Sequence, residues 1–202
     1  MKPYEEEINA YFNKLHAQYG LDIRSLGWSS ASQKKRFDVF AGLADLTGKT
    51  ILDVGCGFGD LAAHLNDRYP YASYMGFDIN PAILEHARKS DRTSYKLHNI
   101  LEEQPEKKYD AVFSLGALNT RFTDNIGIMK KLIEACYEAC YEIAAISMTS
   151  AFVDAEYATE DMFYYDPGEM LNYGRTLCKR VSLLHDYLPH DFTLILKKRP
   201  AL

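Results

Sequence analysis

The chain has 202 residues, of which 47% are hydrophobic and 25% charged, and its formal net charge is −5. This length is enough for one domain with a substantial core but too short for two full ones. The acidic balance argues against a general nucleic-acid-binding surface, which usually carries a basic patch. We therefore expect a single domain, and we do not expect nucleic acid as its partner.

The cysteines and the apolar segments indicate the compartment. The four cysteines lack the paired spacing of a disulfide scaffold, and no stretch of the sequence reaches the length of a membrane span. We therefore expect a soluble, cytoplasmic protein without membrane contact. Cys136 and Cys140 lie one helical turn apart, but no nearby cysteine or histidine completes a tetrahedral metal site. We expect these two thiols to be buried on a helix face, and we expect no metal.

Two amphipathic helical segments come first, at residues 4–19 and 30–43. After residue 50, strands and helices alternate, which is typical of a parallel sheet. The predicted strands cover residues 50–54, 73–79, 94–97, 109–115 and 142–148. The predicted helices between them cover residues 60–68, 81–89 and 125–139.

The C-terminal part changes in character. Residues 149–166 are rich in aromatic and acidic side chains without a clear period, so we expect a loop or lid. A helix begins at Pro167, and strands at 181–184 and 192–196 are close enough to form an antiparallel hairpin. The pattern therefore predicts an α/β fold over residues 1–202: a doubly wound, seven-stranded, mostly parallel sheet with an antiparallel last strand.

The first strand runs directly into a glycine loop, Asp53-Val54-Gly55-Cys56-Gly57-Phe58-Gly59. Glycine tolerates positive φ and lets a ligand approach the backbone. A dinucleotide-binding loop has the spacing G-x-G-x-x-G and binds a pyrophosphate, which Asp53 would repel. An acidic residue followed by glycines at alternate positions favours a ligand with a cationic amino group. This segment resembles motif I of the class I S-adenosylmethionine-dependent methyltransferases.

The resemblance implies a Rossmann-like fold, S-adenosylmethionine as cofactor, and binding residues after successive strands. Asp78 follows the second strand, where a carboxylate can accept hydrogen bonds from both ribose hydroxyls; the alternative is an N-cap for the next helix. Asn99 stands where many family members place an acidic residue against the adenine amino group. The expected cofactor-binding residues are Asp53, Gly55, Cys56, Gly57, Phe58, Gly59, Asp78, Ile79, Asn99, Ile100, Ser114, Leu115, Trp28 and Gln33.

The N-terminal helices are expected to cover the cofactor cleft, because family members often use such an extension as a lid. We assign residues 1–45 to this helical cap. Gln33 lies near a helix start, where it can bind the methionyl carboxylate or a substrate. Trp28 either faces the cleft or anchors the cap on the sheet, and the sequence leaves both readings open.

No residue of the sequence is compelled to be catalytic. The turn between the last two strands should emerge on the cofactor side, and it brings Tyr187, His190 and Asp191 near the mouth of the cleft. Tyr165 comes from the aromatic loop. We name His190, Tyr187 and Tyr165 as candidates, since a histidine has a suitable pKa for a general base. The sequence is equally consistent with His190 being an ordinary turn residue without a catalytic role.

The predicted reaction is methyl transfer to a small molecule by in-line displacement. Residues 114–119 occupy the place where contacts to the methyl acceptor often begin in this family. They lack the Asn or Asp, two prolines and an aromatic that are common in enzymes methylating amino groups of DNA bases. An RNA or protein methyltransferase and a non-catalytic, S-adenosylmethionine-binding regulatory protein remain as alternatives. The acceptor atom and the oligomeric state stay open.

Overall fold

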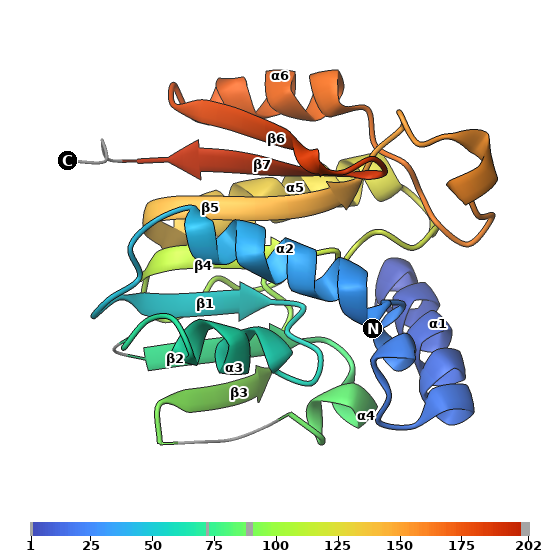
Figure 1. Ribbon diagram of the computed structural model, residues 1–202, viewed down its shortest axis with the longest axis horizontal. Coiled ribbons are helices and arrows are strands. Elements are labelled where there is room, and N and C mark those ends of the chain that lie inside the picture. The colour runs from blue at the N-terminus through green and yellow to red at the C-terminus, as the bar shows by residue number, and fades with distance from the viewer. Residues whose placement is uncertain (1, 72, 88–90, 199–202) are drawn as a thin grey trace.

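A seven-stranded sheet organises the chain, with the strand order β3-β2-β1-β4-β5-β7-β6 (Figure 1). The computed structural model describes residues 2–71, 73–87 and 91–198. The strands are β1 (Thr50–Val54), β2 (Ser73–Asp78), β3 (Thr93–Leu97), β4 (Tyr109–Leu115), β5 (Cys140–Thr149), β6 (Val181–Leu188) and β7 (Asp191–Lys197). β1 to β5 pair in parallel, whereas β7 runs antiparallel to both β5 and β6. The predicted doubly wound sheet with an antiparallel last strand is confirmed.

Helices cover both faces of the sheet. They are α1 (Pro3–Tyr19), α2 (Ser30–Gly42), α3 (Asp60–Asn66), α4 (Pro81–Leu84), α5 (Asn125–Ala139) and α6 (Pro167–Leu177), with short 3₁₀ turns η1 (Ile23–Leu26) and η2 (Ala155–Tyr157). Figure 1 shows α2 and α3 in front of the sheet, α5 and α6 behind it, and α1 beyond the C-terminal ends of β1 and β2.

Strand alternation divides the interior into two apolar cores. Ile51 faces α2 and α3, whereas its neighbour Leu52 joins the core beneath α5 and α6. Successive side chains of a strand point to opposite faces, so each central strand contributes to both cores. Among the described helices, none is long and apolar enough to cross a bilayer.

Local sequence signals fix several helix starts. Ser29 caps α2 by accepting a hydrogen bond from the Ser32 amide at 3.3 Å. Asn80 caps α4 in the same way through the Ile83 amide, and Pro81 occupies the first helical position. The caps therefore place the starts of α2 and α4 directly after the turns that carry the predicted site.

Other boundaries differ from the predicted ones. The helix expected over 81–89 ends at Leu84, and residues 88–90 lie outside the described part of the chain. β5 begins at Cys140 rather than 142, and β6 continues to Leu188 because Leu188 still pairs with Asp191. Tyr187 is therefore a strand residue and not a turn residue. Cys136 and Cys140 are both fully buried, as predicted, but only Cys136 lies on a helix, because Cys140 is the first residue of β5.

Candidate cofactor site

A cavity opens at the C-terminal ends of the parallel strands, where an open α/β sheet binds its ligands. It encloses about 1030 Å³, including its opening to solvent. From the sheet side it is lined by residues 53–57, 60–61, 77–80, 83, 98–101, 115–118 and 132. The N-terminal segment of the chain contributes the rest of the lining, which consists of Tyr4, Ile8, Phe12, Leu26, Trp28, Gln33 and Phe37.

The glycine loop brings bare backbone against the elements that face it. Gly55 and Gly57 have φ values of 78° and 56°, which side chains rarely adopt. A Cβ atom at Gly55 would lie 2.4 Å from the Ala117 Cβ, and one at Gly57 would lie 2.9 Å from the Leu26 Cδ1. The loop therefore needs glycine both for its conformation and for the space between the loop and its neighbours.

Asp53 is a buried carboxylate with one unused oxygen. Its Oδ2 accepts a hydrogen bond from the Tyr74 hydroxyl, whereas its Oδ1 has no partner among the described residues. Burial raises the pKa of Asp53 to about 7, the Tyr74 hydrogen bond opposes this shift, and the nearby charge of Asp78 adds to it. An ammonium group in the cavity would supply the missing partner, so this residue fits the methionyl end of S-adenosylmethionine.

Asp78 holds the glycine loop to the end of β2. Its two carboxylate oxygens accept hydrogen bonds from the Gly57 and Asn80 amides, each at 2.9 Å. Asn80, not Asp78, caps the following helix. Burial raises the pKa of Asp78. Each carboxylate oxygen has two lone pairs, so Asp78 keeps the capacity to accept from ribose hydroxyls.

Asn99 lines the cavity but is already engaged. Its amide nitrogen donates to the Tyr4 hydroxyl at 2.6 Å and to the Glu5 carboxylate, and its oxygen accepts from the Leu101 amide at 2.9 Å. These bonds connect α1 to the segment after β3. The expected contact between Asn99 and adenine stays a prediction.

Trp28 lies between the cavity and the apolar core on the α2 face of the sheet. It lines the cavity, and its ring edge comes within 3.2 Å of the position a Gly116 Cβ would occupy at the end of β4. The other cap residue, Gln33, also lines the cavity and lies 3.5 Å from the Asp60 carboxylate.

Three predicted residues lie outside the lining of the cavity. Ser114 is fully buried and donates to the Val54 carbonyl at 2.9 Å, so its hydroxyl connects β4 to β1. The Phe58 side chain is buried, and its ring centroid lies 6.2 Å from that of His16 and 6.5 Å from that of His86. Gly59 ends the loop as the N-cap of α3.

The candidate catalytic residues also lie outside the lining. The Tyr165 hydroxyl donates to the Leu118 carbonyl at 2.6 Å, and the Tyr187 hydroxyl bonds the Thr193 hydroxyl at 2.9 Å. Burial raises the pKa of both phenols. The Nδ1 of His190 is buried without a partner among the described residues, and burial lowers the pKa of this imidazole.

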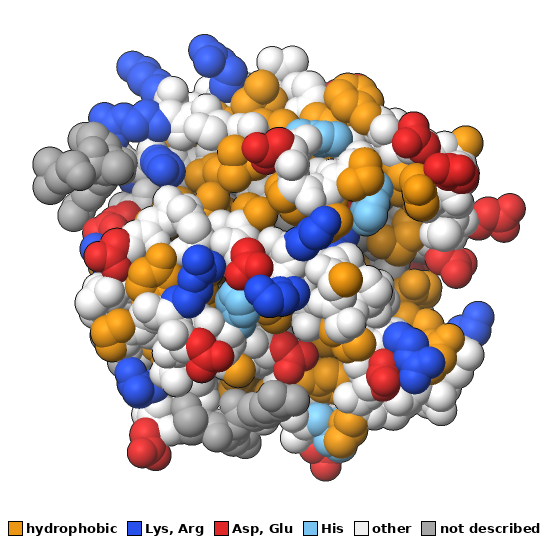
Figure 2. Space-filling view, in the orientation of Figure 1, with side chains coloured by type: hydrophobic (Ala, Val, Ile, Leu, Met, Phe, Trp, Pro, Cys, Tyr) orange, Lys and Arg blue, Asp and Glu red, His pale blue; other side chains and the backbone are white. Residues whose placement is uncertain are grey.

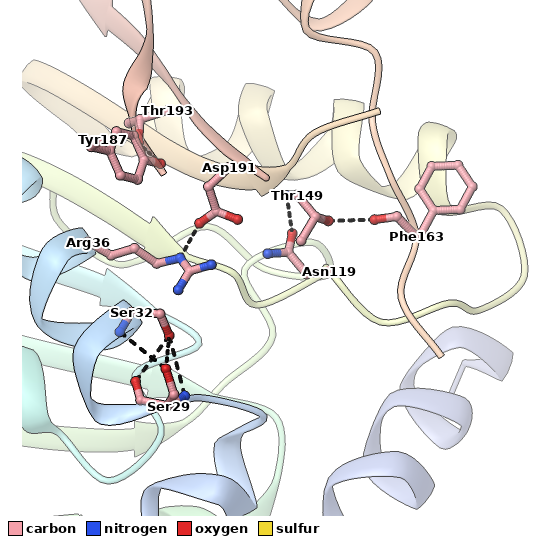
Figure 3. A network of polar contacts seen from close by, with 9 residues as sticks. All are labelled: Ser29, Ser32, Arg36, Asn119, Thr149, Phe163, Tyr187, Asp191 and Thr193. Carbon is pink, nitrogen blue, oxygen red and sulfur yellow. Dashed lines mark hydrogen bonds and ion pairs between the residues drawn. The ribbon is translucent and has the colours of Figure 1, made fainter. Parts of the chain in front are cut away.

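Sequence reasoning missed Arg36. This side chain is 7% exposed and forms an ion pair with the fully buried Asp191, which joins α2 to β7 (Figure 3). Its guanidinium carbon also lies 4.4 Å from the centroid of the Trp28 ring. The sequence did contain one indication of this contact. Arg36 lies one helical turn before Phe40, so it shares the face of α2 that packs on the sheet.

Comparison with known proteins finds similarity to methyltransferases. Residues 51–140 match the model of a methyltransferase domain. A Mycobacterium tuberculosis protein classed as a methyltransferase is 25% identical over 158 residues, covering 74% of this chain and 93% of the relative. The malonyl-[acyl-carrier protein] O-methyltransferase of Acetivibrio thermocellus is 36% identical over 109 residues, covering 51% of this chain and only 38% of that relative.

Solved structures share the fold over nearly the whole chain. The complex of DhpI with SAH superposes with a TM-score of 0.72 at 13% identity and covers 99% of this chain and 98% of that one. Magnesium protoporphyrin IX methyltransferase from Synechocystis PCC 6803 with bound SAH gives a TM-score of 0.71 at 13% identity, covering 96% and 99%. Residues 51–140 are therefore similar to a methyltransferase domain, and the chain shares its fold with a methyltransferase solved with bound SAH.

Proposed function

We propose that the protein methylates a small-molecule acceptor by in-line displacement. The observation that carries this proposal is the cap: side chains from α1, η1 and α2 cover the cavity at the ends of the strands. An acceptor must reach the methyl group beneath these elements, which favours a compact substrate. When bound, S-adenosylmethionine supplies an electrophilic methyl group on its sulfonium, so the protein mainly has to align the two reactants and exclude water.

The chain's own residues divide this work. We assign Asp53 to the ammonium group of the cofactor, Asp78 to its ribose, and the Gly55 and Gly57 backbone to close approach. Residues 1–45 act as the cap. Two side-chain contacts hold α1 in this position: the hydrogen bond from Asn99 to α1, and the bond that the Asn80 side-chain amide donates to the Asn13 side-chain oxygen at 2.9 Å. The free thiols of all four cysteines suit a cytoplasmic enzyme.

Two further observations support a small acceptor. The Synechocystis neighbour is named for magnesium protoporphyrin IX, and the Acetivibrio relative for a malonyl group on an acyl-carrier protein. On the face shown in Figure 2, Lys and Arg side chains gather near the C-terminal end of β7, and over α2 and α3 they alternate with acidic ones. A nucleic acid would be expected to meet a continuous positive surface instead.

Calorimetric titration with S-adenosylmethionine, its demethylated product and NAD tests the cofactor assignment. We expect the wild type to bind the first two ligands and not NAD. We expect Asp78→Ala to weaken both by at least about tenfold, or about 1.4 kcal/mol, because it removes hydrogen bonds to ribose and to the loop. A wild type that binds NAD but neither sulfur ligand contradicts the assignment.

Gly57→Val and Gly48→Val form a matched pair for the glycine loop. Both glycines have positive φ, but a Cβ at Gly48 meets nothing within 4 Å, whereas one at Gly57 meets Leu26. We expect both variants to lose stability and only Gly57→Val to lose cofactor binding. Equal cofactor affinities of the two variants would refute a role of the loop in binding.

A labelled-methyl assay identifies the acceptor class. S-adenosylmethionine carrying a radioactive methyl group is incubated with the protein and with metabolite, RNA and protein fractions separately. We expect label in the metabolite fraction. Label in RNA or protein would establish one alternative, and tight cofactor binding without transfer to any fraction would establish a regulatory protein.

A further inference from the structure

Trp28 stands between two turns that fix its backbone. Before it, Gly27 ends η1 in the left-handed conformation, with a φ of 72°, and its amide donates to the Arg24 and Ile23 carbonyls. After it, Ser29 caps α2. These turns hold the main chain of Trp28, whereas the direction of its side chain is left to the contacts that the indole ring makes.

Arg36 supplies one of these contacts, and its own position is fixed. Its guanidinium carbon lies over the Trp28 ring, 4.4 Å from the centroid, which is the geometry of a cation–π contact. Its Nε donates to the carboxylate of Asp191, which is fully buried at the start of β7 (Figure 3). A hydrogen bond between two buried charges is strong and directional. Asp191 therefore holds the guanidinium, and the guanidinium holds one face of the indole ring.

The edge of the same ring reaches the cavity beside β4. A Cβ atom at Gly116 would lie 3.2 Å from the Cη2 and Cζ2 atoms of Trp28, and both residues line the cavity. Two residues earlier in the chain, Leu26 lies against the glycine loop, since a Cβ atom at Gly57 would be 2.9 Å from its Cδ1. Residues 26–28 therefore cover the end of the cavity that the glycine loop and the end of β4 form.

α1 covers a different end of the cavity. Its Tyr4 hydroxyl accepts a hydrogen bond from Asn99, which follows β3. Its Asn9 side chain donates to the carbonyl of Ile79, which follows β2, at 3.4 Å. Ile8 lies between these two contacts and lines the cavity. The two parts of the N-terminal segment thus cover two ends of one cavity.

We propose that Arg36, held by Asp191, positions the Trp28 ring as a wall over the methionyl end of S-adenosylmethionine. This inference rests on the proposed function, which assigns Asp53, next to the glycine loop, to the ammonium group of the cofactor. Trp28 then determines specificity, because it borders the part of the ligand that a plain nucleoside lacks. Arg36 and Asp191 are positioning residues that act through Trp28, since neither is among the described residues that line the cavity.

Two ligands that share the adenosine group test the wall. S-adenosylhomocysteine carries the amino-acid part, whereas 5′-methylthioadenosine ends in a methyl group after its sulfur. Calorimetry gives the Kd of each ligand. We expect Trp28→Ala to bind S-adenosylhomocysteine at least about tenfold more weakly than the wild type does, and 5′-methylthioadenosine within about twofold. Ile8→Ala is the matched control, because it shortens a lining residue at the other end and should weaken both ligands by a similar factor.

Variants of Arg36 test the positioning. Arg36→Gln combined with Asp191→Asn removes both charges, so no buried charge is left unpaired. We expect this double variant to show the same selective loss as Trp28→Ala, with its retained affinity for 5′-methylthioadenosine as the check that it folds. Arg36→Lys keeps a cation beside the ring and should retain most of the wild-type ratio of the two affinities. Lys35→Gln removes a charge from an exposed neighbour on α2 and should change neither affinity.

Fluorescence reports the ring directly, because Trp28 is the only tryptophan of the chain. We expect S-adenosylhomocysteine to shift the emission of the wild type and of Arg36→Lys to the blue, since the ligand displaces water from the ring, and 5′-methylthioadenosine to shift it less. The double variant should emit further to the red without ligand, because its ring is no longer held.

The outcomes separate this inference from the proposed function. If the wild type binds S-adenosylhomocysteine but Trp28→Ala weakens both ligands alike or neither, the wall is refuted and the cofactor assignment stands. If Trp28→Ala shows the selective loss while the double variant keeps the wild-type ratio and emission, positioning by Arg36 is refuted. A wild type that binds neither ligand contradicts the proposed function, and this inference falls with it.

Discussion

At the scale of single residues, Asp53 shows a conflict between stability and binding. The Asp53 carboxylate is buried, and one of its oxygens has no partner among the described residues. Ionising it there is costly, and burial therefore raises its pKa to about 7. The same unpartnered oxygen is what a cationic ligand requires. The free protein therefore bears a cost that ligand binding relieves, as is common at functional sites.

Asp53→Asn gives this conflict a measurable pH dependence. Between pH 3.8 and about 7, the folded state keeps a proton on Asp53 that the unfolded state releases, so wild-type stability falls as pH rises through this window. Asparagine is neutral throughout. We compare the melting temperature of Asp53→Asn with that of the wild type at each pH. The variant minus wild-type difference should be several degrees larger at pH 8 than at pH 5.5, because each kcal/mol of stability corresponds to about 2–4 °C.

The Tyr74 hydroxyl offers a second variant for the same prediction. It donates to Asp53 and opposes the rise in its pKa, so Tyr74→Phe should move the pH window upward. Asp53→Asn should also weaken binding of S-adenosylmethionine at pH 8. Melting differences that are identical at both pH values would contradict a raised pKa for Asp53.

At the scale of helices and strands, the sequence predicts the features that depend on neighbouring residues, such as the positions of the strands. The strand before the glycine loop and the next strand along the chain, predicted at residues 50–54 and 73–79, correspond to β1 and β2. Asp110 at the start of β4 accepts hydrogen bonds from the amide and the hydroxyl of Thr50, 60 residues away in the chain. The Arg36–Asp191 pair joins residues 155 apart in the chain, and no local pattern reports such a contact.

The proposed role of α1 as a cap makes a prediction for hydrogen exchange. Tyr4, Ile8 and Phe12 line the cavity, so a bound ligand should oppose opening of α1. We expect saturating S-adenosylhomocysteine to slow amide exchange in residues 3–19 by at least about tenfold, which corresponds to about 1.4 kcal/mol. α6 contributes no residue to the lining of the cavity and serves as the reference element. Equal changes in α1 and α6 would contradict a cap function.

At the scale of the whole molecule, a buried ion pair joins α2 to the C-terminal hairpin of β6 and β7. Arg36 lies on α2 and Asp191 begins β7, so the pair connects the two parts of the chain that flank residues 51–140, the segment that matches the methyltransferase domain. Burial raises the pKa of Asp191, whereas the Arg36 guanidinium lowers it. The carboxylate therefore depends on its partner to remain ionised in the interior.

A double-mutant cycle measured by urea unfolding tests this dependence. Arg36→Gln leaves an uncompensated buried carboxylate, and removing one member of a buried pair costs about 3–5 kcal/mol. The double variant with Asp191→Asn should regain most of that loss, because two neutral amides can bond each other. Lys34→Gln is the control: it breaks a pair with Asp38 whose side chains are 70% and 43% exposed, and it should cost less than about 1 kcal/mol. If the two single losses simply add in the double variant, Arg36 and Asp191 do not depend on each other, and the stability of this edge of the sheet comes from its apolar packing.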